Sequence, residues 1–321
     1  MAIALALVIY AVSIATLGPR LIQSSTWLAR SPRLAVCAWQ SLSASLLLSV
    51  VLAAAVVAFP GGGLAGGLAD VLHTCLAVLR LQYGAVTSSA ASTAAFAVMV
   101  AVIARTTYCV LEVAVTSTRQ RRAQMQALAL LARPAADTAR SMLVVEHERA
   151  LAYCLPGRRG AVVVTTAAVE ALEPAELAAV LGHEHAHLRG HHHLVIGFSA
   201  ALHRAFPWVS ALRLAHRETQ DLVELLADDA AVRRHSPAHL AAALVRLAEA
   251  QTPRATLGIG GRLALARVRR LQRARQPLRR PQRLGLLLLI TAVLITPAAA
   301  AVQPAAAATA TDHCVLASAP R

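Results

Sequence analysis

The sequence predicts an α-helical membrane protein with about four spans that carries a mainly helical α+β domain with a small sheet. Hydrophobic residues make up 57% of the chain, and the mean hydropathy of +0.57 is high for a water-soluble protein. Three segments are apolar over the length that a bilayer requires, about 20 residues, and a fourth is marginal in length. The region between the third and fourth segments, about 180 residues long, is large enough for one hydrophobic core.

The apolar segments divide the chain into domains. The prediction is an N-terminal membrane region (1–104) with spans at 2–17, 36–59 and 86–104, a folded domain (105–283), a fourth span (284–302) and a short tail (303–321). The first segment is short, and a signal peptide is the alternative. No basic residue precedes it and no small-residue cleavage site is evident, so a span is favoured.

Arginines beside the spans predict their orientation in the plasma membrane. All 31 basic residues are arginine, which is typical of a GC-rich bacterium, and they gather at 18–35 and at both margins of 105–283. Cytoplasmic segments carry the excess of basic residues. The folded domain is therefore expected in the cytoplasm, with both termini and the 60–85 loop outside. No recognition motif accompanies the arginines, so we expect them near the lipid bilayer and expect no direct nucleic-acid binding.

A short run in the folded domain has the pattern of a zinc site. His183-Glu184-His185-Ala186-His187 fits H-E-x-x-H. Histidines four residues apart lie on one face of a helix, so both imidazoles can bind one metal ion. Pro174 is a suitable first residue for this helix, and apolar residues at helical spacing follow it. The pattern predicts His183 and His187 as ligands and Glu184 as the base that takes a proton from the attacking water.

A third ligand is expected downstream of the motif. Glu224 and Asp228 are four residues apart in a second predicted helix within 217–234, so their carboxylates share a face. This predicts Glu224 as the third zinc ligand, with Glu218 as the alternative, and Asp228 as the group that orients a ligand histidine. A solvated cluster is the alternative for the motif itself, because His191, His192 and His193 follow it.

Two strands are expected before the motif helix, at Leu143–Val145 and Ala161–Thr165, around a turn at Pro156-Gly157. We expect the second of these strands to bind the substrate in extended form at a sheet edge. The residues expected to do so are Val162, Val163, Val164 and Thr165. His235 and Arg233 are candidates for the donor that stabilises the transition state.

The two motifs, H-E-x-x-H at 183–187 and E-x-x-A-D at 224–228, resemble those of membrane gluzincin metallopeptidases. HtpX-type proteases share both, and the BlaR/MecR family is more similar. The segment from Ala152 to Gly157, followed by 161–166, is similar to the A-x-x-x-P-G … V-V-V-T hairpin of that family. The antibiotic receptors of the family carry a C-terminal penicillin-binding sensor, which is not expected in this chain.

The resemblance implies a zincin-like metallopeptidase domain with one Zn²⁺ per chain and a zinc-dependent endopeptidase activity. It implies a regulatory role, in which the protein substrate is cytoplasmic, such as a winged-helix repressor of the BlaI/MecI type. An HtpX-like quality-control protease is one alternative. A non-enzymatic membrane receptor with a protease-like domain is another.

Overall fold

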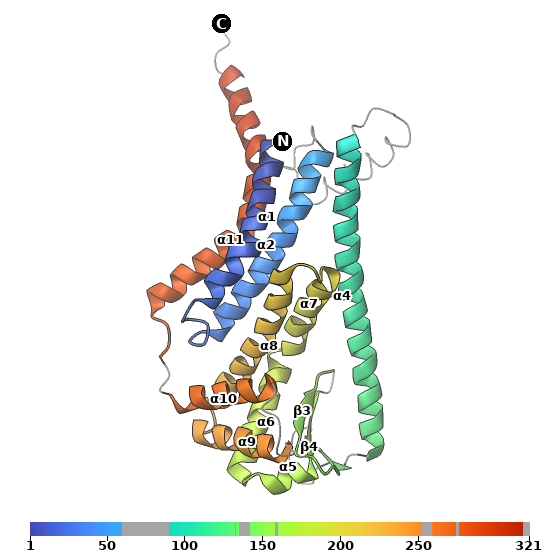
Figure 1. Ribbon diagram of the computed structural model, residues 1–321, viewed down its shortest axis with the longest axis vertical. Coiled ribbons are helices and arrows are strands. Elements are labelled where there is room, and N and C mark those ends of the chain that lie inside the picture. Colours follow the sequence, from blue (N-terminus) through green and yellow to red (C-terminus); the bar gives the residue numbers. More distant parts are fainter. Residues whose placement is uncertain are drawn as a thin grey trace.

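The described part of the chain contains four long helices that are candidate membrane spans. The computed structural model describes the backbone of residues 1–59, 90–131, 133–134, 142–157, 160–251, 259–273 and 276–316. Within these residues, the helices long and apolar enough to cross a membrane are α1 (Ala2–Gln23), α2 (Pro32–Ala58), α4 (Ala90–Leu131) and α11 (Arg280–Leu316). Figure 1 shows α1, α2 and α11 packed together, with α4 standing beside α2 and running on past the sheet.

Each of these helices extends beyond the apolar segment that predicted it. α4 continues to Leu131 although its expected span ends at residue 104. Neither proline nor glycine occurs in α4, so the polar, arginine-containing stretch after 104 stays helical. The boundaries expected at 104 and 283 therefore fall inside continuous helices. Residues 86–89 of the third expected span and the 60–85 loop lie outside the described residues.

One backbone carbonyl fixes α11 against α1 and α2. Pro297 has no N–H, so the carbonyl of Val293, one turn earlier, loses its helical partner. The hydroxyl of Tyr10 donates to this oxygen at 2.8 Å, and the hydroxyl of Ser45 donates at 2.7 Å. An unpaired carbonyl in a lipid environment is costly, so these two bonds favour this packing of the three helices.

The folded domain contains a small sheet. Its strands, in spatial order, are β1 (Arg133–Pro134), β2 (Met142–Val145), β4 (Ala161–Thr165) and β3 (Ala152–Leu155). β4 pairs in parallel with β2 and antiparallel with β3. The two expected strands are confirmed as β2 and β4, and β3 adds a third strand that leads into the Pro156-Gly157 turn.

The expectation that Val162–Thr165 binds substrate at a sheet edge is wrong. Both sides of β4 are occupied, by β2 and by β3, so β4 has no free edge. All of its residues are buried. A short continuous apolar run is typical of a strand covered on both faces. The free edge on this side of the sheet belongs to β3.

Between the sheet and α11, the described residues form the helices α5 (Thr166–Ala171), α6 (Pro174–Arg189), α7 (His192–Ala205), α8 (Ser210–Ala231), α9 (Pro237–Gln251) and α10 (Ile259–Gln272). α6 packs against β3, α8 and α9, and α10 packs against α9. α8 begins earlier and ends earlier than the helix expected within 217–234.

The α7–α8 pair packs directly on the membrane helices. Trp39 of α2 is fully buried in a cluster with Ala211, Ala215 and Leu222 of α8. A second cluster joins Leu202 of α7 with Cys109 of α4. α8 carries the acidic pair expected at the metal site, so this packing fixes the site relative to the membrane helices.

Candidate metal centre

Side chains in the first turn of α6 fix the helix that carries the motif. Pro174 occupies its first position, as expected. The carboxylate of Glu176 accepts a hydrogen bond from the backbone N–H of Glu173 at 3.0 Å, which satisfies a donor at the helix start. Glu176 is buried and pairs with Arg246 of α9 at 3.3 Å. α6 is thereby held in a defined rotation, which directs the two motif histidines toward α8.

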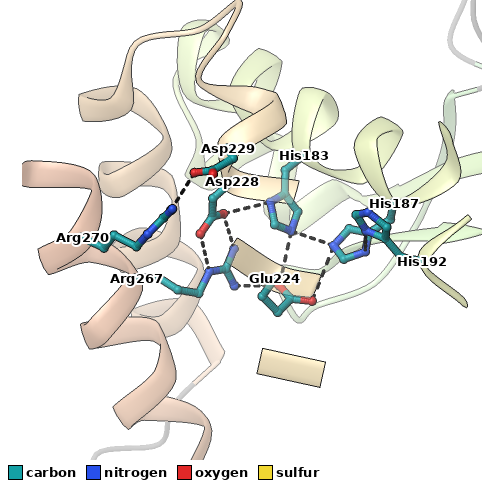
Figure 2. Close-up of polar contacts among 8 residues, drawn as sticks. All are labelled: His183, His187, His192, Glu224, Asp228, Asp229, Arg267 and Arg270. Carbon is teal, nitrogen blue, oxygen red and sulfur yellow. Dashed lines mark hydrogen bonds and ion pairs between the residues drawn. The ribbon is translucent and has the colours of Figure 1, made fainter. Parts of the chain in front are cut away.

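Three expected ligands converge at one point between α6 and α8 (Figure 2). The Nε2 atoms of His183 and His187 lie 3.1 Å apart. The two carboxylate oxygens of Glu224 lie 3.4 Å from His183 Nε2 and 3.5 Å from His187 Nε2. Within the part of the chain that the structure describes, this is the one group of three histidine, cysteine or acidic residues with ligand atoms close enough to share an ion.

The donor set and its spacing fit zinc. Zinc is bound tetrahedrally at about 2.0–2.2 Å by nitrogen and oxygen, which places neighbouring ligand atoms about 3.4 Å apart. The three observed separations, 3.1, 3.4 and 3.5 Å, are close to that value. Two histidines and one glutamate form a donor set of catalytic zinc sites, which leave the fourth position open.

A buried ion pair supports the first histidine ligand. Asp228, fully buried on α8, has Oδ1 3.0 Å from His183 Nδ1. Arg267 of α10 donates to the two oxygens of Asp228 at 2.9 and 2.7 Å, and its Nη1 lies 2.9 Å from Glu224 (Figure 2). A hydrogen on Nδ1 leaves the Nε2 lone pair of His183 facing the shared point, which is the tautomer that a ligand needs.

A third histidine supports the second ligand. His192, at the start of α7, has Nδ1 3.1 Å from His187 Nδ1. The turn before it contains His191 in the left-handed region, at φ 48°. A Cβ on Gly190 would overlap the His192 ring, so a glycine is required for this close approach. His192 is therefore part of the site and not of a solvated cluster.

The environment of Glu184 suits a proton acceptor. Burial raises the pKa of its carboxyl, His183 opposes the rise, and the charge of Glu224 adds to it. A raised pKa brings the group nearer to neutral pH, where a general base works best. Cys154 of β3 is its neighbour. Burial and the charge of Glu184 raise the pKa of this thiol to about 12, so the thiol stays protonated beside the carboxylate.

The close contacts among the three expected ligands shift their pKa values in different directions. Burial alone would lower the pKa of His183, but its close contacts with the carboxylates of Asp228 and Glu224 outweigh burial and raise the pKa to about 9. Burial and the neighbouring His183 lower the pKa of His187 to about 4. Burial opposes ionisation of Glu224, and the His183 contact overcomes it, which lowers the pKa to about 2. At neutral pH a proton therefore occupies His183, and a bound cation would replace it.

Some residues considered from the sequence lie elsewhere. Glu218, the alternative ligand, accepts a hydrogen bond from Gln23 of α1 at 2.9 Å. The ring of His235 packs against Gly182, and Arg233 lines a pocket near the start of α2. Among the described residues, neither forms a hydrogen bond or an ion pair with the motif side chains, so the structure supports neither as the donor for the transition state.

Sequence reasoning missed two supporting residues. Arg267 belongs to an arginine-rich stretch, and nothing in its local pattern marks it as the partner of Asp228. His192 was visible only as one of several neighbouring histidines.

The part of the chain that contains this site matches a known protein family. Residues 114–253 match the family model of peptidase family M48. This range includes all three converging ligands, Glu184 and Asp228, and peptidases of the family are generally zinc-dependent. The match supports a membrane-type zinc metallopeptidase and does not distinguish a BlaR/MecR type from an HtpX type. No curated protein and no solved structure matches the chain.

Proposed function

We propose that this chain is a membrane-anchored, zinc-dependent endopeptidase. The observation that carries the proposal is the convergence of His183, His187 and Glu224 at zinc-ligand spacing. When bound, zinc supplies a Lewis acid that polarises the scissile carbonyl and acidifies water.

The chain's own groups supply the remaining chemistry. Glu184 accepts a proton from the attacking water and returns it to the leaving amine. Asp228 keeps the hydrogen of His183 on Nδ1, and Arg267 neutralises the buried charge of Asp228. His192 performs the equivalent positioning for His187. These roles explain why acidic residues, although scarce in the chain, gather at this point.

β3 is the strand that we propose for substrate binding. It is an edge of the sheet, it packs against α6, and its Cys154 adjoins Glu184. An extended peptide added to this edge would lie along α6 with its backbone near the general base. Backbone pairing of this kind requires little side-chain specificity, so β3 replaces β4 in the proposal.

For the biological role, we propose a regulatory protease that acts on a cytoplasmic protein, such as a winged-helix repressor. This finer proposal rests on the resemblance to BlaR/MecR proteins and on the predicted cytoplasmic orientation. The alternative is a protease with broad specificity that degrades damaged membrane proteins. Cleavage creates new protein N-termini, which can be identified in cells that carry the wild type and in cells that carry Glu184→Gln. A comparison of the two sets separates these roles. One or a few cleaved proteins favour regulation, and many cleaved membrane proteins favour quality control.

Glu184→Gln is the test of the enzymatic proposal. The variant keeps the three ligands, so we expect it to retain zinc and to lose about 10²–10⁴-fold in cleavage rate, the usual contribution of a general base. His185→Gln, on another face of α6, is the matched control. Wild-type cleavage of an identified substrate by Glu184→Gln would overturn the base assignment.

A further inference from the structure

A strongly basic pocket lies where the folded domain meets the membrane helices. Its volume is about 630 Å³, within the range of small-ligand pockets, about 300–1,000 Å³. Three regions line it: the turn into α2, the facing ends of α6 and α8, and the segment that leads into α11.

The lining of this pocket has a large excess of positive charge. Its arginines, six in number, are Arg30, Arg33, Arg189, Arg233, Arg234 and Arg283. Asp229 is the acidic residue of the lining, and its carboxylate pairs with Arg270 at 2.8 Å (Figure 2). Among the described residues, neither Arg33 nor Arg233 forms an ion pair or a side-chain hydrogen bond. A concave site lined by one sign of charge concentrates ions of the opposite sign.

The pocket is built into the fold and does not depend on surface side chains alone. Arg30 donates to the backbone carbonyls of Gln276 and Pro277 at 3.0 and 3.4 Å, which joins the α1–α2 turn to the segment before α11. Arg270, which binds Asp229, also donates to the carbonyl of Ala29 at 2.9 Å. These bonds keep the walls of the pocket together.

The position of the pocket indicates the kind of anion. Arg33 lies in the first turn of α2, and Arg283 lies in the first turn of α11. Both helices are candidate membrane spans that start beside the pocket. Basic pockets between membrane helices at a bilayer surface bind lipid headgroups, because the phosphates of anionic lipids are concentrated at that level.

We propose that this pocket binds the phosphate-bearing headgroup of an anionic phospholipid. One wall is made by Arg189 of α6 and by His192, whose ring contacts the ligand His187. A bound headgroup therefore bridges the membrane surface and the helix that carries the H-E-x-x-H motif. The lipid site therefore defines how α6 is positioned relative to the bilayer. Lipid binding can be tested without any peptidase activity.

Native mass spectrometry of the full chain in detergent, titrated with phosphatidylglycerol or phosphatidylcholine, tests the site. We expect the wild type to retain phosphatidylglycerol in preference to phosphatidylcholine. Arg33→Gln/Arg233→Gln should bind phosphatidylglycerol roughly 30-fold more weakly, at about 1 kcal/mol for each arginine. Arg119→Gln/Arg122→Gln removes the same charge from the exposed surface of α4 and should bind like the wild type.

Three results would overturn the proposal. The first is equal binding of both lipids by the wild type. The second is equal weakening by the pocket and control variants, which would indicate bulk attraction. The third is displacement of the lipid by inorganic phosphate or glycerol phosphate at similar concentration, which would indicate a soluble anion. If the first pocket variant does not fold, Arg189→Gln/Arg234→Gln removes two other arginines of the lining and provides the same test.

Discussion

Replacing Asp228 with asparagine tests how the buried ion pair supports the metal centre. In the wild type, the fully buried carboxylate lies 3.0 Å from His183 Nδ1 and accepts two hydrogen bonds from Arg267. Asparagine has nearly the same shape but no charge. The variant therefore holds the His183 ring less firmly and leaves Arg267 as a buried cation with Glu224 as its remaining anionic partner.

Both consequences weaken zinc binding, and the second also lowers the folding stability. Loss of a partner that orients a ligand costs about 10–100-fold in metal affinity. The uncompensated charge of Arg267 repels a cation and adds to this loss. Breaking a buried ion pair costs about 3–5 kcal/mol of folding stability. We expect the low end of that range, because Arg267 keeps its contact with Glu224 at 2.9 Å.

Competition with a chelating zinc indicator and denaturant unfolding measure the two effects separately. The double variant Asp228→Asn/Arg267→Met removes the uncompensated charge. We expect it to regain part of the stability and only the charge-dependent part of the zinc affinity. Asp229→Asn is the matched control, because its pair with Arg270 is partly exposed.

A zinc affinity of Asp228→Asn within about threefold of the wild type would refute the positioning role, since the expected loss is at least about tenfold. Full recovery of zinc affinity in the double variant would show that charge, and not orientation, decides the effect. If the single variant does not fold, the double variant still provides this comparison.

Three further predictions follow from the site and the spans. His187→Ala and Glu224→Ala should each lose most of the one zinc per chain in elemental analysis, and unchanged content would contradict the ligand assignment. Because the pKa of His183 is raised to about 9, the metal-free ring keeps its proton below that pH, and zinc must displace it. The apparent zinc affinity should therefore rise about tenfold per pH unit between about pH 6 and 8, whereas a plateau above about pH 7 would indicate an ordinary histidine. Reporter fusions after Gly63, Arg140 and Ala308 should report outside, inside and outside, and an external Arg140 would exclude a cytoplasmic protease domain.

The sequence by itself determined the features that depend on local spacing. The apolar segments predict long helices because a span requires an uninterrupted apolar stretch. The fourfold spacing of His183 with His187, and of Glu224 with Asp228, places each pair on one helix face whatever the rest of the chain does. Pro174 marks the start of α6 because its fixed φ suits the first turn. These are properties of short segments, so the printed residues are sufficient.

Only the tertiary structure decided which segments meet. Arg267 binds Asp228 although 38 residues separate them, and no local pattern selects it among the neighbouring arginines. The apolar run of β4 predicts a buried strand, but whether it has a free edge depends on the pairing partners β2 and β3. His192 reaches His187 because Gly190 leaves room for its ring. Pairing partners, strand order and close approach depend on the packing of distant segments, which the spacing of residues along the chain does not encode locally.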